Sequence, residues 1–89
     1  MADEAQWESL KARLDEFHAW PDDYVFKFIM PVEQYRHVQP HLPSRGETTT
    51  RNSRHGAYIS VTHVARVNSS DEVIAVYRAV AEIEGIISL

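Results

Sequence analysis

The chain opens with a stripe of apolar side chains at helical spacing. Successive members are three, four and three residues apart, with charged residues between them: Trp7, Leu10, Leu14 and Phe17. This spacing is typical of an amphipathic helix that buries one face. The helix is expected to end before the Trp20-Pro21 pair, because a residue that precedes proline is sterically disfavoured in helical geometry.

The next segment alternates between two faces, which predicts a β-strand. Its aromatic face is expected to point into the core: Tyr24, Phe26, Phe28 and Met30. The opposite face contains Lys27 and is therefore the more open one. Pro31 suits the first turn of a helix, where its missing N–H is not needed. That helix is expected to end at about residue 39, because Pro40 interrupts the pattern.

Two β-prone runs follow, residues 48–51 and 57–67, and the five residues between them contain Asn, Ser and Gly. Two such runs joined by a short, glycine-containing segment predict a β-hairpin. The more apolar side chains of the second strand are expected to face the helices: Ile59, Val61, Ala65 and Val67. His63 shares that face, where a histidine is more often a core residue held by a backbone hydrogen bond than a ligand.

The last part of the chain carries the signature of a capped helix. Ser69 followed three residues later by Glu72 forms a capping box, and Asp71 adds negative charge at the positive end of the helix dipole. The buried stripe of this helix is predicted to be Val73, Val76, Tyr77, Val80 and Ile83. Gly85 is expected to end the helix, and residues 86–89 to form a short final strand.

The predicted order is one helix followed by β-α-β-β-α-β. This order fits a ferredoxin-like α+β fold, in which a four-stranded antiparallel sheet carries two helices on one face. We expect residues 1–20 to form an additional N-terminal amphipathic helix and residues 21–89 to form the ferredoxin-like domain.

The sheet face away from the two helices is predicted to be unusually apolar for a solvated surface. Its members are Val25, Lys27, Ile29, Tyr58, Ser60, Thr62, Val64 and Arg66. An apolar patch of this kind marks an interaction surface. Either the N-terminal helix packs on this face or near its edge, or a second copy of the chain covers it in a homodimer. The interface candidates are Val25, Ile29, Tyr58 and Val64.

The composition is that of a folded globular domain. The chain has 89 residues, of which 44% are hydrophobic and 25% charged, and it has no cysteine. This fits one domain and excludes a disulfide framework, a thiolate zinc site and a cysteine nucleophile. No apolar stretch is long enough to span a membrane or to form the core of a signal peptide. We therefore expect a cytoplasmic protein without a membrane partner.

The net charge of −4 is the sum of three segments that differ in charge. Residues 1–33 carry eight acidic and three basic residues, residues 34–66 carry five arginines and one acidic residue, and residues 67–89 carry four acidic residues and one basic residue. Four of the five histidines also lie in the middle segment, so its positive charge grows as histidines protonate in mildly acidic solution. The middle segment is thus a candidate surface for anions.

The hairpin turn is the sharpest candidate site. The charged or protonatable residues in or next to it are Arg45, Arg51, Arg54 and His55. Ser53 and Gly56 allow exposed backbone N–H groups, and arginine guanidinium groups bind phosphate and carboxylate through paired hydrogen bonds. The predicted site for a small anionic ligand therefore comprises Arg51, Ser53, Arg54, His55 and Gly56. The alternative is a solvated turn, or one that pairs with the acidic first helix.

Other chemistries find less support in the residues. His37 and His41 have the spacing of zinc ligands on a helix, but Pro40 spoils the turn between them, so no metal site is predicted. No phosphate-binding loop, dinucleotide motif or nucleophile motif is present, so we expect no catalytic residue, no cofactor and no enzymatic activity. The RNA recognition motif has the same element order, but of its stacking residues only Tyr58 survives here, and the acidic net charge also argues against a nucleic-acid partner.

Three stretches of the chain match a known pattern together. Residues 21–29, PDDYVFKFI, resemble an opening strand with Phe-Lys-Phe runs; residues 49–62, TTRNSRHGAYISVT, resemble a TRxSSKGKYxSVT hairpin; and residues 81–89, AEIEGIISL, resemble a closing IxGVxxxL. These patterns are those of the small YbeD-like proteins, a bacterial family of unknown function. The amphipathic N-terminal helix is similar to an extension in one branch of that family.

The resemblance implies a ferredoxin-like βαββαβ domain, similar in outline to ACT-type regulatory domains, which bind amino acids and pair their sheets. Arg51, Ser53 and Gly56 match the hairpin positions, whereas His55 and Ala57 stand where the family usually has basic residues. The family has no settled activity, so it supplies no catalytic residue. We expect a non-enzymatic regulatory or small-ligand-binding module. The alternative is a protein-interaction adaptor that uses the open sheet face and the N-terminal helix.

Overall fold

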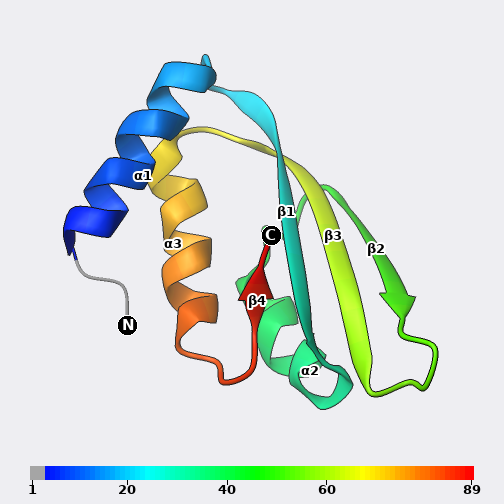
Figure 1. Cartoon of the computed structure of the whole chain (residues 1–89). Helices are drawn as coiled ribbons and strands as arrows, with labels where there is room; N and C mark the ends of the chain where they lie inside the picture. The colour runs from blue at the N-terminus through cyan, green and yellow to red at the C-terminus, as the bar shows by residue number, and fades with distance from the viewer. Residues whose placement is uncertain (1–3) are drawn as a thin grey trace.

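Two long strands form the centre of the fold (Figure 1). The structure is a computed structural model, and it describes residues 4–89. Strands β1 (Asp22–Pro31) and β3 (Tyr58–Val67) pair antiparallel along all ten residues. Strand β2 (Glu47–Asn52) pairs with β3, and β4 (Ile87–Ser88) pairs with β1. The sheet is therefore four-stranded and antiparallel, in the order β2-β3-β1-β4. Residues 1–3 of the predicted N-terminal segment lie outside the described part of the chain.

Three helices contribute buried side chains to one core: the N-terminal helix and the two helices predicted on one face of the sheet. They are α1 (Glu4–Phe17), α2 (Tyr35–Val38) and α3 (Ser70–Ala81). Helix α2 is a single turn between two 3-10 turns, residues 32–34 and 39–41, and the second of these accommodates Pro40. The predicted α+β class, the N-terminal helix and the order of the strands along the chain are confirmed.

The core lies between the helices and one face of the two central strands. The inward side chains Phe26, Phe28 and Met30 of β1 are fully buried, as predicted. From β3, the predicted inward residues Ile59, Val61, Ala65 and Val67 are also buried. Because side chains of a strand alternate between its faces, burying this set leaves the odd-numbered residues of β1 on the opposite side.

Helix α1 packs against α3, so it does not cover the open sheet face. The Lys11 ammonium donates a hydrogen bond to Ser70 Oγ at 2.9 Å, and Arg78 Nη2 lies 2.7 Å from the Glu4 carboxylate. The apolar stripe of α1 also points toward the helical layer, where Leu14 is buried. The expectation that the N-terminal helix could cover the open face is therefore wrong, because its Leu14 is buried in the core and its Lys11 and Glu4 bond to α3.

Phe17 departs from its predicted place in the buried stripe, since its side chain is 77% exposed. Helix α1 ends at this residue, before Trp20-Pro21 as predicted, and the chain then turns toward β1. Trp20 packs against the core from this connection instead. The Trp20 indole donates to Asp15 at 2.8 Å and stacks on the His18 ring with centroids 4.8 Å apart.

The predicted cap of α3 is present. The Glu72 backbone N–H donates to Ser69 Oγ at 3.3 Å, and the Glu72 carboxylate accepts from the Asn68 N–H at 3.1 Å. The second bond therefore reaches one residue further back than in a standard capping box.

Gly46 is required where the chain enters β2. Its φ is +100°, and a Cβ atom placed there would lie 2.3 Å from the Val64 carbonyl oxygen. Gly56, in the hairpin turn, also has a positive φ of +73°, but a Cβ atom there would have no neighbour within 4 Å. Both positions therefore impose backbone strain on any other residue, but only at Gly46 would a side chain also overlap with neighbouring atoms.

Replacing Gly46 by alanine is expected to lower the free energy of unfolding by about 2–4 kcal/mol, because it combines a strained φ with overlap against β3. Gly56→Ala meets the φ strain alone and is expected to cost about 1 kcal/mol. Urea denaturation of both variants measures the difference. Equal losses in the two variants would contradict the close approach of Gly46 to β3.

Candidate functional site

The hairpin turn uses its own backbone N–H groups to close itself. The Ser53 N–H donates to the Tyr58 carbonyl at 2.8 Å, the Gly56 N–H donates to the Ser53 carbonyl at 3.0 Å, and Ser53 Oγ accepts from the Tyr58 N–H at 3.0 Å. The expectation that the N–H groups of Ser53 and Gly56 face a ligand is therefore not met. These two residues shape the turn, and any contact with an anion falls to its side chains.

In the described part of the chain, no carboxylate pairs with the arginine side chains of the turn. Arg51, Arg54 and His55 are all exposed. Among residues 4–89, Arg51 and Arg54 take part in no ion pair, whereas Arg45 and Arg66 each have an acidic partner. The alternative in which the turn pairs with the acidic first helix is thus not observed, and the positive charge of the turn is open to solvent.

A hollow of about 210 Å³ lies beside the turn. Its lining residues are Ile29, Arg51, Asn52, Ser53, Tyr58, Ile59 and Ser60. Arg51 stands opposite Ser60 in the ladder, which places its side chain on the open sheet face, and Ile29 stands opposite Ser60 from the other side. The structure therefore brings two predicted ligand residues, Arg51 and Ser53, together with two predicted interface residues, Ile29 and Tyr58. Arg54, His55 and Gly56 lie outside this lining.

Arg45 is not next to the turn, contrary to the prediction. It precedes β2, and the six residues of that strand separate it from the turn by about 20 Å. Arg45 Nε donates to the Arg66 carbonyl at 2.5 Å, and its guanidinium pairs with the Glu72 carboxylate of α3. The physical reason is that α3 offers a carboxylate at this end of the hairpin.

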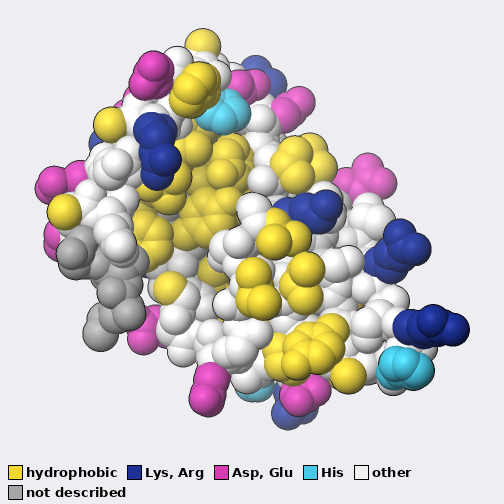
Figure 2. All heavy atoms as spheres, viewed as in Figure 1, with side chains coloured by type: hydrophobic (Ala, Val, Ile, Leu, Met, Phe, Trp, Pro, Cys, Tyr) yellow, Lys and Arg dark blue, Asp and Glu magenta, His cyan; other side chains and the backbone are white. Residues whose placement is uncertain are grey.

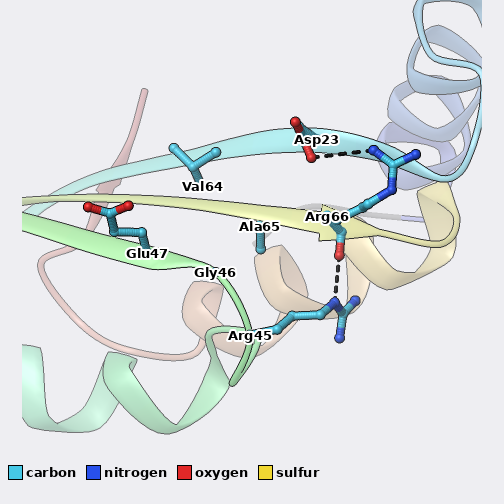
Figure 3. A pocket seen from close by; sticks show the side chains of 7 residues that line it. All are labelled: Asp23, Arg45, Gly46, Glu47, Val64, Ala65 and Arg66. Carbon is cyan, nitrogen blue, oxygen red and sulfur yellow. Dashed lines mark hydrogen bonds and ion pairs between the residues drawn. The ribbon is translucent and has the colours of Figure 1, made fainter.

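Figure 3 shows Arg45 and Arg66 around a second hollow, of about 420 Å³. Arg66 Nη1 lies 3.6 Å from the Asp23 carboxylate, and Arg66 Nη2 donates to the Pro21 carbonyl at 3.2 Å. Since both guanidinium groups here already have acidic partners, this hollow attracts an anion less strongly than the turn does.

His63 is a core histidine, as predicted. It is 3% exposed, and its Nε2 lies 3.0 Å from the Arg45 carbonyl. A carbonyl oxygen only accepts, so Nε2 carries a proton and, in the neutral ring, Nδ1 accepts from the Thr48 hydroxyl at 2.7 Å. His37 and His41 are exposed, and no group of three or more possible metal ligands gathers within residues 4–89.

The open sheet face is bare in the described structure. Val25 is 52% exposed, Tyr58 51% and Val64 40%, and Val25 stands directly opposite Val64. Ile29, the fourth interface candidate, is half-buried. The candidates therefore form an apolar surface on the two central strands, away from all three helices.

A groove of about 410 Å³ lies on the helical side of β1. Its lining residues are Trp7, Leu10, Tyr24, Tyr77, Ala81, Ser88 and Leu89. Figure 2 shows hydrophobic side chains gathered in this region, between the helices and the strands. Sequence reasoning placed Trp7, Leu10 and Tyr77 in the core and so missed the groove, because a periodic stripe cannot show where the packing of two helices and a strand leaves a gap.

Two tyrosines meet in this groove. The hydroxyl oxygens of Tyr24 and Tyr77 are 2.9 Å apart and share a hydrogen bond. Burial, and next the hydrogen bond with Tyr24, raise the pKa of Tyr77 well above its ordinary range.

The geometry defines a small α+β domain in which three helices pack with a four-stranded antiparallel sheet. The chain belongs to the family described as "Protein of unknown function (DUF493)", whose model matches residues 15–89. It is 30% identical over 83 residues to the UPF0250 proteins of Shewanella putrefaciens and Shewanella oneidensis, covering 86% of this chain and 94% of each relative. The UPF0250 protein of Shewanella amazonensis is 29% identical over the same coverage.

The resemblance to the YbeD-like family, drawn from the first strand, the hairpin and the C-terminus, is therefore confirmed. No solved structure shows significant similarity to the chain. Within residues 4–89, no helix combines the length and the apolar character needed to cross a membrane.

The raised pKa of Tyr77 predicts how stability changes in alkaline solution. The folded state favours the neutral phenol, so this stabilisation is complete below about pH 10, the ordinary pKa of tyrosine, and is lost as the pH rises toward the higher folded pKa. Urea unfolding at pH 8 and pH 10.5 is expected to show a larger loss of stability for the wild type than for Tyr77→Phe. The same loss in both proteins would contradict the burial of the Tyr77 hydroxyl.

Proposed function

We propose that this chain is a non-enzymatic regulatory or ligand-binding module, and that its hairpin end binds a small anion. The observation that carries the proposal is the pair of exposed arginines, Arg51 and Arg54, which have no acidic partner in the described structure. A guanidinium group without an internal partner keeps its full capacity to bind phosphate or carboxylate.

The hollow beside the turn indicates the kind of anion. It combines the Arg51 guanidinium and the Ser53 and Ser60 hydroxyls with the apolar surfaces of Ile29 and Tyr58. This chemistry suits a small molecule that has one anionic group and an apolar body. A free phosphate ion would use the arginines and leave the apolar side unused.

The arrangement of the elements supports the same proposal. We infer that residues 21–89 form a ferredoxin-like domain. The strand order β2-β3-β1-β4 matches that fold, and so do the helices α2, between β1 and β2, and α3, between β3 and β4. Regulatory domains of the ACT type have this outline and bind amino acids. A similar outline alone does not define a ligand, so the test must be direct.

A panel of amino acids, nucleotides and inorganic phosphate tests the proposal by thermal unfolding. A ligand at about 100 times its Kd is expected to stabilise the domain by about 2.7 kcal/mol, which raises the Tm by about 10 °C or more for a domain of this size. Arg51→Ala and Arg54→Ala together are expected to remove the shift. Arg13→Ala, at an exposed arginine on α1, is the control that keeps it. A panel that leaves the wild-type Tm unchanged would refute the ligand-binding proposal.

A second candidate function is a protein-interaction adaptor that docks through the open sheet face. The observation that favours it is the exposed pair of Val25 and Val64 on the two central strands. We infer that this surface acts without α1, which lies in the helical layer. A second copy of the chain is the simplest partner, because two copies of one apolar face complement each other in a homodimer.

Light scattering with Val64→Glu tests this candidate. A wild-type dimer is expected to become monomeric, since a charge buried in an apolar interface has no partner. Phe17→Glu is the matched control, because Phe17 is an exposed apolar residue at the end of α1, outside the sheet, and its variant is expected to keep the wild-type mass. A wild-type protein that is monomeric at all concentrations would remove the homodimer.

A further inference from the structure

Strand β2 is an edge strand whose outer side is open. It lies at one end of the strand order β2-β3-β1-β4, and Figure 1 shows it on the side away from α1 and α3. Among residues 4–89, β2 pairs with β3 alone. All six of its residues are exposed, so the helical layer does not cover this edge.

The hydrogen bonds of the hairpin show which backbone groups of β2 face outward. Ser53, which directly follows β2, donates its N–H to the Tyr58 carbonyl of β3 at 2.8 Å. Such bonds alternate along an antiparallel pair, so odd-numbered residues of β2 bond toward β3 and even-numbered residues face away from it. The N–H and C=O groups of Thr48 and Thr50 therefore point outward along the open edge.

Strand β2 lacks the features with which proteins protect an edge strand from pairing. Such features include proline, lysine side chains and β-bulges. The six residues of β2 contain no proline or lysine, and their register with β3 runs without a break. Three consecutive threonines favour extended backbone and present only small side chains. This edge is therefore open to the approach of a second strand.

The two charged residues of β2 indicate what that second strand is. Glu47 stands opposite Val64 and Arg51 opposite Ser60, so both charged side chains lie on the open sheet face. The two charges are placed symmetrically, each two residues from Thr49. Within residues 4–89, neither takes part in an ion pair. A strand with one unpaired charge of each sign at symmetric positions is complementary to an antiparallel copy of itself.

We propose that β2 pairs antiparallel with β2 of a second copy of this chain, with the two-fold axis at Thr49. Glu47 of each copy then stands opposite Arg51 of the other, and cross-strand neighbours of opposite charge stabilise a sheet. Thr48 of each copy stands opposite Thr50 of the other, and each of these pairs exchanges backbone hydrogen bonds in both directions. The two four-stranded sheets thereby become one continuous sheet.

The charges also select this register over its neighbours. Moving the axis to Thr48 would place Glu47 opposite Thr49 of the other copy. Moving it to Thr50 would place Arg51 opposite Thr49. Both of these registers leave the two charges without a direct cross-strand partner, whereas the axis at Thr49 pairs both of them in each copy.

This interface is distinct from the open sheet face and goes beyond the proposed anion site. Pairing at the edge leaves Val25 and Val64 uncovered, so the open face stays free for a further contact. Arg51 also lines the hollow beside the turn. A guanidinium group has more N–H donors than one carboxylate uses, so Arg51 keeps donors for a ligand, and Arg54 lies outside the interface.

Charge reversal tests the ion pairs, with association of the full chain measured by sedimentation equilibrium. Glu47→Arg and Arg51→Glu each place like charges opposite each other at both contacts, and each is expected to weaken association about tenfold or more. An equal mixture of the two variants restores opposite charges at both contacts and is expected to associate more tightly than either variant alone. Glu8→Arg, the same change at an exposed residue of α1, is the control that keeps wild-type association.

Amide hydrogen exchange tests the backbone pairing. The N–H groups of Thr49 and Arg51 bond toward β3 and are expected to be protected at every protein concentration. Those of Thr48 and Thr50 are expected to become protected only as the dimer forms. Thr50→Pro removes an outward donor, keeps the bonds to β3, and is expected to weaken association about tenfold or more.

Several results would overturn the proposal. They are a chain that stays monomeric at millimolar concentration, a dimer with unprotected Thr48 and Thr50 amides, and a mixture of the charge variants that associates no better than each alone. A dimer lost with Val25→Glu but kept with Glu47→Arg would place the second copy on the open sheet face instead. Glu47 lies outside the lining of the hollow, so failure of this interface is distinguishable from failure of the anion site, which the thermal shift reports.

Discussion

The antiparallel pairing of β1 with β3 is the constraint on which the rest of the structure depends. Ten consecutive residue pairs fix both strands in one register, so burying Phe26 and Phe28 also determines where every other side chain of the two strands points. The helices cover only one side of this ladder. The opposite side chains, among them Val25 and Val64, are then left on an uncovered surface as a direct consequence of the register.

The same ladder explains why three separate surfaces arise in so short a chain. Its far end carries the hairpin turn, its uncovered side carries the apolar face, and β2 beside β3 has an outer edge that pairs with no other strand of the described residues. The three surfaces therefore lie at different parts of one sheet: its end, its face and its edge.

Charge is distributed over the fold by the same packing. Helices α1 and α3 join through Lys11 with Ser70 and Asp71, and through Arg78 with Glu4. The carboxylate of Glu72 holds Arg45 at the start of β2. Acidic residues from both ends of the chain thus neutralise bases in the helical layer and at one end of the hairpin. No acidic side chain of the described residues pairs with Arg51 or Arg54 at the other end, which leaves the positive charge concentrated there.

Local chemistry was enough to predict most of the elements and the inward faces. The alternation around Phe26 and Phe28, the capping box at Ser69 and the glycine-containing turn each act over a few residues, so their signals can be read from neighbouring positions. The family resemblance rests on the same short stretches. The side of the sheet on which α1 packs, the distance of Arg45 from the turn and the groove beside Tyr77 depend instead on contacts between residues far apart in the chain. Periodicity shows that a helix has an apolar face, but only the packed tertiary structure decides which surface that face meets and which surfaces stay open.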